Sequence, residues 1–266
     1  MSGRGAHGQA VEPTIPSPIC GTGCAKLRAV RLGAVFLWLC LFSRAARASV
    51  PDDPCVSERN VTGIDVSSYQ GEIDWKQVRG AGVTFAFARA ADGTGLIDDR
   101  FAGNYRRMKR AGLRRGAYQV FRASVDPKKQ ADLLIKLVLR LGRPDLPLVA
   151  DVETDDGQPP ETLRTGLRKW LRRIETRTGR RPIIYTSPSM SDRLGERFGH
   201  YHLWVAHYEV DCPTVPDGWR RWAFWQHSSK GQLPGINGPV DLDHFAGTIG
   251  QLRRFGRARL LASVGP

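Results

Sequence analysis

The sequence has few cysteines, no apolar segment long enough to cross a membrane, and no motif that binds a phosphate or a metal. Its 266 residues include five cysteines, and their spacing matches no zinc site. The apolar run at residues 32–42 is too short to span a bilayer. No glycine-rich phosphate loop follows the first predicted strand, and no nucleic-acid recognition motif is present. These absences predict a protein without a metal, a cofactor, a nucleic-acid partner or a stable membrane anchor.

Acidic residues are scarce relative to basic ones. The chain has 40 lysines and arginines against 26 aspartates and glutamates, which gives a formal net charge of +14. Residues 1–48 carry six basic side chains and one acidic side chain, so the remainder keeps a charge of +9. Such a basic surface favours polyanionic surroundings, which include nucleic acid, anionic lipid and an anionic cell wall. Charge alone does not choose among them.

Residues 1–48 have the organisation of a signal peptide with a long N-terminal region. Three basic residues, the last of them Arg31, precede the apolar run at 32–42. Ala46-Arg-Ala48 follows the run, with small residues at the two positions that a signal peptidase reads. We expect cleavage near Ala48 and a secreted or periplasmic protein. The unusual length before the basic residues indicates a start codon assigned too far upstream.

Only two cysteines, Cys55 and Cys212, follow the predicted cleavage site. Two cysteines in an exported domain most simply form one disulfide, which would stabilise the fold by about 2–4 kcal/mol. Two unpaired thiols are the alternative. We expect a short mature N-terminal segment at residues 49–60, a single folded domain at 61–250 and a basic C-terminal tail at 251–266.

After Cys55 the chain alternates short apolar runs with helical stretches. The predicted strands are Gly63–Ser67, Thr84–Arg89, Gly116–Phe121, Leu148–Glu153, Pro182–Thr186, Leu203–Ala206, Ala223–Gln226 and Val240–Phe245. The predicted helices are Trp75–Ala81, Phe101–Ala111, Lys128–Leu141 and Pro160–Thr178. This alternation predicts an α/β fold, a parallel closed barrel of the (β/α)8 type with some helices missing or short. A doubly wound open sheet is the alternative, which the absence of a phosphate loop disfavours.

The most informative run is Leu148–Glu153, an apolar strand that ends in two carboxylates separated by one residue. Side chains at positions i and i+2 of a strand point to one face, so Asp151 and Glu153 are delivered to one place. Two carboxylates whose Cα atoms lie about 6.5 Å apart can break a glycosidic bond by acid/base chemistry. A strand that simply runs into an acidic loop is the alternative, because Asp155 and Asp156 follow at once.

Polar and aromatic side chains also stand at the ends of the other predicted strands. In a parallel barrel these ends meet at one rim, where active sites are built. Aromatic side chains beside several acids fit a carbohydrate site better than a nucleic-acid groove, where acids would repel phosphates. Each aromatic taken alone is more often core than ligand. The candidates are Asp65, Arg89, Tyr118, Gln119, Asp151, Glu153, Tyr185, Trp204, Trp225, Gln226, Asp241 and Asp243.

The motifs at these positions resemble those of the glycoside hydrolase family 25 muramidases, also called Chalaropsis-type lysozymes. The resemblance covers residues 63–247, nearly the whole predicted domain. It rests on Gly63-Ile-Asp65-Val-Ser-Ser-Tyr-Gln-Gly71, Ile73-Asp-Trp75, Gly116-Ala-Tyr118, Asp151-Val-Glu153, Ile184-Tyr185-Thr-Ser, Leu203-Trp204-Val-Ala, Phe224-Trp225-Gln226 and Val240-Asp241-Leu-Asp243, in this order.

The resemblance implies cleavage of the β-1,4 bond between N-acetylmuramic acid and N-acetylglucosamine in peptidoglycan. It implies that Glu153 is the general acid, a partly desolvated carboxyl with a raised pKa. Asp151 would stay ionised and either assist the substrate's N-acetyl group or stabilise the oxocarbenium ion. The resemblance implies that Asp65 and Asp241 are the remaining catalytic carboxylates, which hold the sugar or tune Glu153; for Asp241, a capping or salt-bridging role is the alternative. The implied substrate-binding residues are Arg89, Tyr118, Tyr185, Trp204, Trp225, Gln226 and Asp243.

This chain departs from the family pattern at two places, which puts its subsite specificity in question. Arg89-Ala-Ala-Asp92-Gly93 stands where Lys-Ala-Thr-Glu-Gly is common, and Gln119 stands where His often follows the tyrosine. A catalytically silent peptidoglycan-binding protein on the same barrel is the first alternative, and a polypeptide that disrupts walls or membranes by charge alone is the second. No wall-binding repeat follows the domain, so we expect affinity for the wall to rest on the basic surface and to weaken with salt. We also expect a monomer.

Overall fold

The computed structural model describes residues 60–257. The predicted signal peptide and Cys55 lie outside these residues, so cleavage near Ala48 and the disulfide to Cys212 remain predictions. The described part of the chain forms an α/β domain built on eight strands and six α-helices, which confirms the predicted class.

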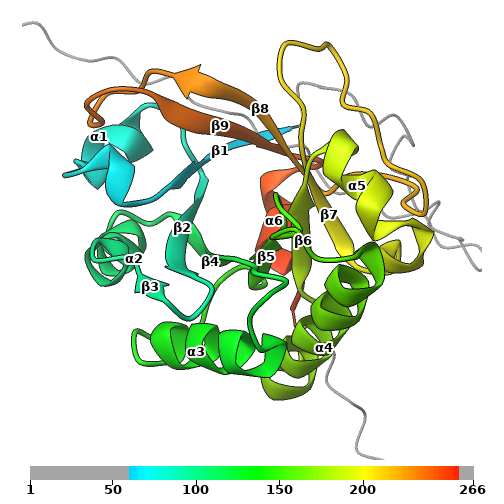
Figure 1. Ribbon diagram of the computed structural model, residues 1–266. Helices are drawn as coiled ribbons and strands as arrows, with labels where there is room; N and C mark the ends of the chain where they lie inside the picture. Colours follow the sequence, from blue (N-terminus) through cyan, green and yellow to red (C-terminus); the bar gives the residue numbers. More distant parts are fainter. Residues whose placement is uncertain (1–59, 258–266) are drawn as a thin grey trace, which may run out of the picture. The chain divides into compact units, whose positions relative to one another are not determined.

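Eight strands close into a barrel, coloured from cyan to orange along the chain (Figure 1). Each strand is hydrogen-bonded to the next one around the ring, and the last strand returns to the first. A short strand β3 (Leu96–Ile97) stands outside the ring as a hairpin. The barrel strands in ring order are β1 (Val61–Val66), β2 (Phe85–Asp92), β4 (Arg114–Val120), β5 (Val149–Asp151), β6 (Ile183–Thr186), β7 (His202–Ala206), β8 (Phe224–Gly231) and β9 (Val240–Phe245).

The last strand runs opposite to the other seven. Strands β1 to β8 of the ring pair in parallel, whereas β9 pairs antiparallel with both β8 and β1. The expectation of a fully parallel barrel is therefore wrong for β9. Its connection from β8, residues 232–239, is too short for a parallel crossover, which needs about a dozen residues or more. As a result, β9 begins, rather than ends, at the rim where the parallel strands have their carboxyl ends.

Helices cover the barrel between the early strands but not between the late ones (Figure 1). Within the described residues, no helix stands between β7 and β8 or between β8 and β9, as expected for an irregular barrel. None of the described helices is long and apolar enough to cross a membrane. The helices are α1 (Trp75–Gly80), α2 (Phe101–Arg110), α3 (Pro127–Leu139), α4 (Pro160–Thr178), α5 (Pro188–Leu194) and α6 (Ile249–Arg254).

Local sequence signals explain where the long helices begin and end. Asp126 caps α3 because its side chain accepts hydrogen bonds from the backbone N–H groups of residues 128 and 129. Pro160 opens α4 at a position where a missing N–H is harmless. Gly179 ends α4 in the left-handed conformation, at a φ of 66°. The four predicted helices are confirmed to within two residues at each end.

Alternation along the strands builds two apolar layers. Outward-facing residues, among them Ile64 and Val205, pack against the helices. Inward-facing aromatic residues fill the barrel, where Phe87 stacks on Trp204 with 4.6 Å between ring centroids. A Cβ atom on Gly116 would lie 2.2 Å from the Phe87 ring, so only glycine leaves room for this inner aromatic layer. The inner layer supports the rim from below.

Helix α6 closes the end of the barrel opposite the rim. Its Leu252 is fully buried in the inner apolar layer. Phe255, just after the helix, packs against Phe224 at the start of β8 and Phe245 at the end of β9. The barrel is therefore open to substrate at one end only, the rim.

Candidate active site

Five carboxylates gather at the rim. Asp65 lies in β1 and Asp151 ends β5, with Glu153 two residues further on. Because β9 runs antiparallel, Asp241 at its start is paired directly with Asp65. The charge of Glu153 acts on Asp65, Asp151 and Asp241 alike. The structure thus brings together the four carboxylates that the sequence nominates as catalytic.

The five carboxylates differ in exposure. Asp65, Asp151 and Asp243 are buried, at 5%, 6% and 0% relative exposure, whereas Asp241 is half-buried. Glu153 is exposed. The expectation that Glu153 is partly desolvated is therefore wrong in this structure, and Glu153 is instead the rim carboxyl most open to a substrate.

Burial and mutual repulsion favour the protonated forms of the inner carboxyls. Burial, followed by the charges of Glu153 and Asp65, raises the pKa of Asp151 well above its usual value. This direction is opposite to the expectation that Asp151 simply stays ionised. Burial and the charge of Glu153 raise the pKa of Asp241 to about 6. Like charges confined to one small site cannot all be present together, so these groups titrate as a set.

A hydrogen-bonded chain fixes the position of Asp65. Tyr185 donates from its hydroxyl to Gln226 Oε1 at 2.8 Å, and Tyr208 donates to the same oxygen. Gln226 then donates from Nε2 to Asp65 Oδ2 at 2.7 Å. Gln226 and Tyr185 are buried, at 3% and 7% exposure. These two predicted substrate-binding residues therefore hold Asp65 in place and offer little surface to a saccharide.

Asp243 and Trp204 lie deeper than the sequence suggests. Trp204 is 2% exposed and donates from Nε1 to Asp243 Oδ1 at 2.9 Å. Burial, followed by the charges of Asp65 and Asp241, raises the pKa of Asp243 well above its usual value. With no exposed surface, Asp243 has no direct contact to offer a substrate, contrary to its predicted binding role.

Arg89 is tied to its own side of the rim. It donates from Nε to Asp98 Oδ2 at 3.0 Å and from Nη2 to Ser68 Oγ at 3.1 Å. Its guanidinium carbon lies 5.1 Å from the centre of the Tyr69 ring. Tyr69 is 84% exposed, so this ring, supported by Arg89, is the aromatic surface that the β1 and β2 side of the rim presents to solvent.

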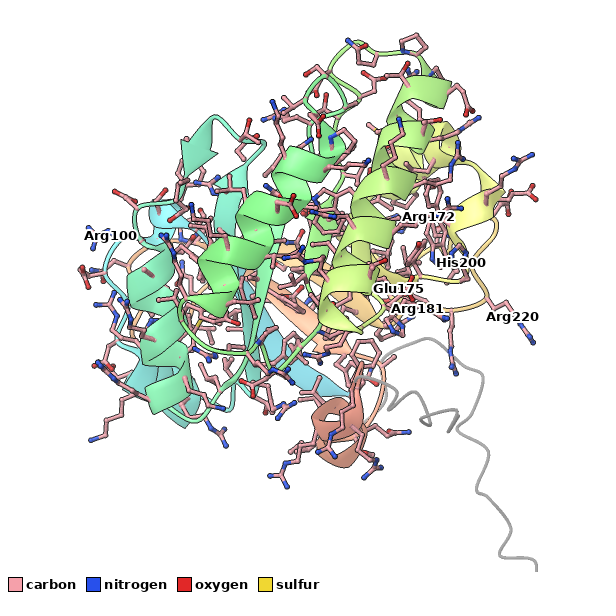
Figure 2. The ribbon with its side chains drawn as sticks, turned by 90° about the horizontal axis from the view of Figure 1, so that it is seen from below. Arg100, Arg172, Glu175, Arg181, His200 and Arg220 are labelled. Carbon is pink, nitrogen blue, oxygen red and sulfur yellow. The ribbon has the colours of Figure 1, made fainter. Side chains whose placement is uncertain are left out.

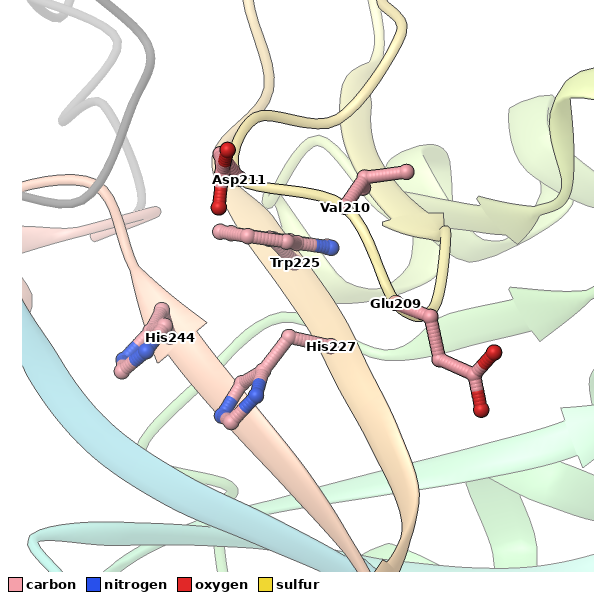
Figure 3. Close-up of a pocket in the computed structure, with 6 residues that line it drawn as sticks. All are labelled: Glu209, Val210, Asp211, Trp225, His227 and His244. Carbon is pink, nitrogen blue, oxygen red and sulfur yellow. The ribbon is translucent and has the colours of Figure 1, made fainter.

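The two remaining predicted aromatic residues point in different directions. Tyr118 is half-buried in the inner layer, where the charges of Asp65 and Asp151 reach its hydroxyl. Trp225 packs in the outer layer, donates from Nε1 to the His207 carbonyl at 2.7 Å and lies beside His227 (Figure 3). Because strand residues alternate between faces, Trp225 faces away from the carboxylates that its neighbour Gln226 contacts. The structure does not bring Trp225 into the site.

Three residues at the rim were missed by the sequence reasoning. They are Tyr208, which contacts Gln226, Asp98, which pairs with Arg89, and the exposed Tyr69. Tyr208 lies two residues beyond the end of β7, just as Glu153 lies two residues beyond the end of β5. Counting residues two positions past each strand as rim candidates would therefore have included Tyr208. Asp98 lies in a connection and carries no pattern of its own.

The arrangement offers proton transfer and negative charge. The site contains one exposed carboxyl, one half-buried carboxyl and three buried ones, and burial together with neighbouring negative charge raises the pKa of Asp65, Asp151 and Asp241. Among the described residues, no group of three or more His, Cys, Asp or Glu side chains is arranged to hold a metal ion. An acid beside carboxylates at such a rim is suited to cleaving an acetal bond.

Comparison with known proteins places this site in a family. Residues 64–236 match the sequence profile described as Glycosyl hydrolases family 25. The chain is 41% identical to the uncharacterized protein YegX of Escherichia coli O6:H1 over 201 residues, 73% of each chain. It is 36% identical to Lysozyme M1 of Streptomyces globisporus over 205 residues, 72% of this chain and 70% of that protein.

A solved structure supports the same assignment. The crystal structure of the bacterial lysozyme from Streptomyces coelicolor superposes with a TM-score of 0.69 at 34% identity, over 75% of this chain and 98% of that one. The profile match spans Asp65, Asp151 and Glu153, and the irregular barrel is common to both structures. The chain belongs to family 25 of the glycosyl hydrolases, the lysozyme family.

Proposed function

We propose that this protein is a muramidase that hydrolyses the β-1,4 bond between N-acetylmuramic acid and N-acetylglucosamine in peptidoglycan. The observation that carries the proposal is the exposed Glu153 standing over the buried Asp151 and Asp65 at the rim of a family 25 barrel. The names of the relatives, among them Lysozyme M1, point to the same substrate. No wall-binding repeat is needed for this activity, because the basic surface attracts anionic walls.

Glu153 delivers the proton in the proposed reaction. It is the one exposed carboxyl among the five at the rim, so it can reach the glycosidic oxygen of a bound strand. Burial, followed by the charge of Glu153, raises the pKa of Asp151, so Asp151 holds a proton beside Glu153 to a higher pH than an isolated carboxyl would. As the proton passes to the leaving oxygen through Glu153, the negative charge left on the pair faces the forming positive charge on the sugar.

Asp151 acts on the substrate in this scheme. Its Oδ1 is buried and accepts no hydrogen bond from the described residues, so it is free to accept one from a substrate N–H. We propose that it orients the N-acetyl group for attack on the anomeric carbon, with direct stabilisation of the oxocarbenium ion as the alternative. Asp65 and Asp241 supply further negative charge beside the same sugar.

Release of soluble fragments from purified peptidoglycan tests the activity. Mature wild type should generate new N-acetylmuramic acid reducing ends, seen by mass and reducing-end analysis, and Glu153→Gln should lose about 10³-fold in rate or more. The matched control is Glu209→Gln, which alters an exposed glutamate in the loop after β7 that forms an ion pair with Lys230. If wild type and Glu153→Gln both bind the wall and neither releases soluble fragments, the protein is instead a silent peptidoglycan-binding protein.

We also propose that the protein acts outside the cytoplasm as a monomer. The support is the apolar run at 32–42 followed by Ala46-Arg-Ala48, together with the positions of Cys55 and Cys212. N-terminal sequencing of the exported protein should find Ser49 first. Mass analysis with and without reductant then tests the disulfide between Cys55 and Cys212.

A further inference from the structure

Asp243 is a fully buried acid that the proposed reaction does not use. It points into the barrel from β9, at 0% relative exposure, opposite Gln226 of β8. One carboxyl oxygen, Oδ1, accepts a hydrogen bond from Trp204 at 2.9 Å. The other, Oδ2, accepts no hydrogen bond from any described residue. The carboxyl of Asp65 lies diagonally across the β1–β9 pairing, where Asp65 is paired with Asp241 and Gly63 with Asp243, and its charge acts on Asp243.

The surrounding donors fix which atoms can accept. An indole N–H can only donate, so Asp243 Oδ1 must be an acceptor. The hydroxyls of Tyr185 and Tyr208 both donate to Gln226 Oε1, which leaves the Gln226 amide nitrogen to donate to Asp65 Oδ2. Asp65 therefore accepts at Oδ2, and of the two acids Asp243 is the more deeply buried, at 0% relative exposure against 5%. A hydrogen bond between the two carboxyl groups then requires a proton, and the oxygen that no donor reaches is Asp243 Oδ2.

We propose that Asp243 is a positioning residue that remains protonated at neutral pH and donates its proton to Asp65, which it thereby holds as an oriented anion at the rim. This inference deepens the proposed function, on which its catalytic part rests. Burial, followed by the charges of Asp65 and Asp241, raises the pKa of Asp243. Burial and the charge of Asp241 also raise the pKa of Asp65, and the hydrogen bond from Gln226 acts against that rise. The shared proton also leaves one negative charge fewer among five crowded carboxylates.

Replacement of Asp243 by asparagine tests the proton directly. An asparagine side chain copies the protonated acid, because its Nδ2 can donate to Asp65 while its Oδ1 accepts from Trp204. We expect Asp243→Asn to lower kcat by no more than about threefold, whereas Asp243→Leu, of similar volume but unable to donate, should lower kcat by about tenfold or more with a smaller change in KM. Asp65→Asn, which removes the anion itself, should be the most impaired of the three. The thermal unfolding of each variant shows whether it is folded.

Two outcomes of the kinetic comparison would overturn the proposal. If Asp243→Asn is as inactive as Asp65→Asn, then Asp243 must be ionised. If Asp243→Leu, correctly folded, retains the kcat of wild type, then donation to Asp65 has no role in positioning. A purely structural role would lower the stability of both variants without separating the asparagine from the leucine variant in kcat.

Infrared spectroscopy and pH-dependent unfolding test the proton without relying on activity. At pH 7, wild type should show the carbonyl stretch of a protonated carboxyl that is absent from Asp243→Asn. A proton held when folded but released when unfolded contributes stability that is complete below about pH 4 and is lost as the pH rises. Asp243→Asn should remove this loss. If wild type shows no muramidase activity, these two measurements still show whether Asp243 is protonated. Absence of both the carbonyl stretch and the pH-dependent loss of stability would refute the proposal that Asp243 holds a proton.

Discussion

Among single residues, the half-buried Asp241 should make the stability of the protein depend on pH. Burial and Glu153 raise its pKa to about 6 from an ordinary 3.8. The folded state then holds a proton that the unfolded chain releases, so this contribution to stability is complete below about pH 3.8 and is lost as the pH rises through about 6. We expect Asp241→Asn to gain about 1–2 kcal/mol over wild type on moving from pH 4 to pH 8, measured by urea unfolding.

A second aspartate provides the control for this measurement. Asp132 is paired with Arg173, at 2.8 Å between Oδ1 and Nε, and this hydrogen bond lowers the pKa of Asp132. Its contribution has the opposite sign, present above about pH 4 and lost at lower pH, so Asp132→Asn should gain nothing on the same change of pH. An Asp241→Asn variant whose difference from wild type is the same at both pH values would contradict the interpretation.

At the residue scale, the sequence predicts the acids better than their roles. The spacing of Asp151 and Glu153 on one strand places both at the rim, because period-two alternation is a property of every strand. Exposure is not encoded in that spacing, so the sequence leads to a desolvated Glu153 where the structure has an exposed one. Trp225 and Gln226 are adjacent in one strand, so their side chains lie on opposite faces. Gln226 points inward to Asp65, and Trp225 therefore points outward, away from the site.

Among the elements, α6 should be needed to keep the barrel closed. Its Leu252 is fully buried against the inner aromatic layer. We expect Leu252→Ala to lower the free energy of unfolding by about 2–5 kcal/mol, measured by denaturant titration, because the cavity would be lined by rings that cannot collapse into it. Leu139→Ala, at the end of α3 where the side chain is 49% exposed, should change it by less than about 0.5 kcal/mol. Equal decreases in the free energy of unfolding in the two variants would show that burial of Leu252 at the closed end of the barrel is not important for stability.

At the element scale, the positions of helices and strands follow from pattern but the direction of β9 does not. The alternation of apolar residues in Val240–Phe245 is the same whether the strand runs up or down. The signal that decides is the length of the connection, since residues 232–239 can form a hairpin but not a crossover. Connection length therefore needs to be weighed beside periodicity when a barrel is predicted from sequence.

Over the whole molecule, charge is distributed unevenly between the rim and the outside. The rim carries five acids, whereas Arg172, Arg181, His200 and Arg220 lie around the end of α4 (Figure 2). Arg172 and Arg181 both act on the nearby Tyr201, and Glu175 is the acid that accompanies them, 3.9 Å from Arg181. We expect this positively charged surface to bind anionic walls, and the acidic rim to carry out the proposed hydrolysis.

Charge reversal at this basic surface should weaken wall binding without affecting the chemistry. Arg220 is exposed, so Arg220→Glu should weaken sedimentation with intact walls by about two- to fivefold at low salt, because one favourable charge becomes repulsive. The difference from wild type should shrink as salt is raised, and the rate on short soluble glycans should be the same. Lys76→Glu, an equal change of charge on α1, is the control for a general effect of net charge. Equal weakening by both variants would argue against a localised surface.

The position of β9 as the last strand in the sequence also decides when the barrel can be completed. This strand carries Asp241 and Asp243, and it closes the ring by pairing with both β8 and β1. A ribosome delivers β9 after every other strand, so a growing chain lacks two of the five rim acids and keeps two unpaired sheet edges until residue 245 has emerged. A fragment released by premature termination would be equally incomplete. For a protein proposed to attack cell walls, this order of synthesis keeps the unfinished chain harmless to the cell that makes it.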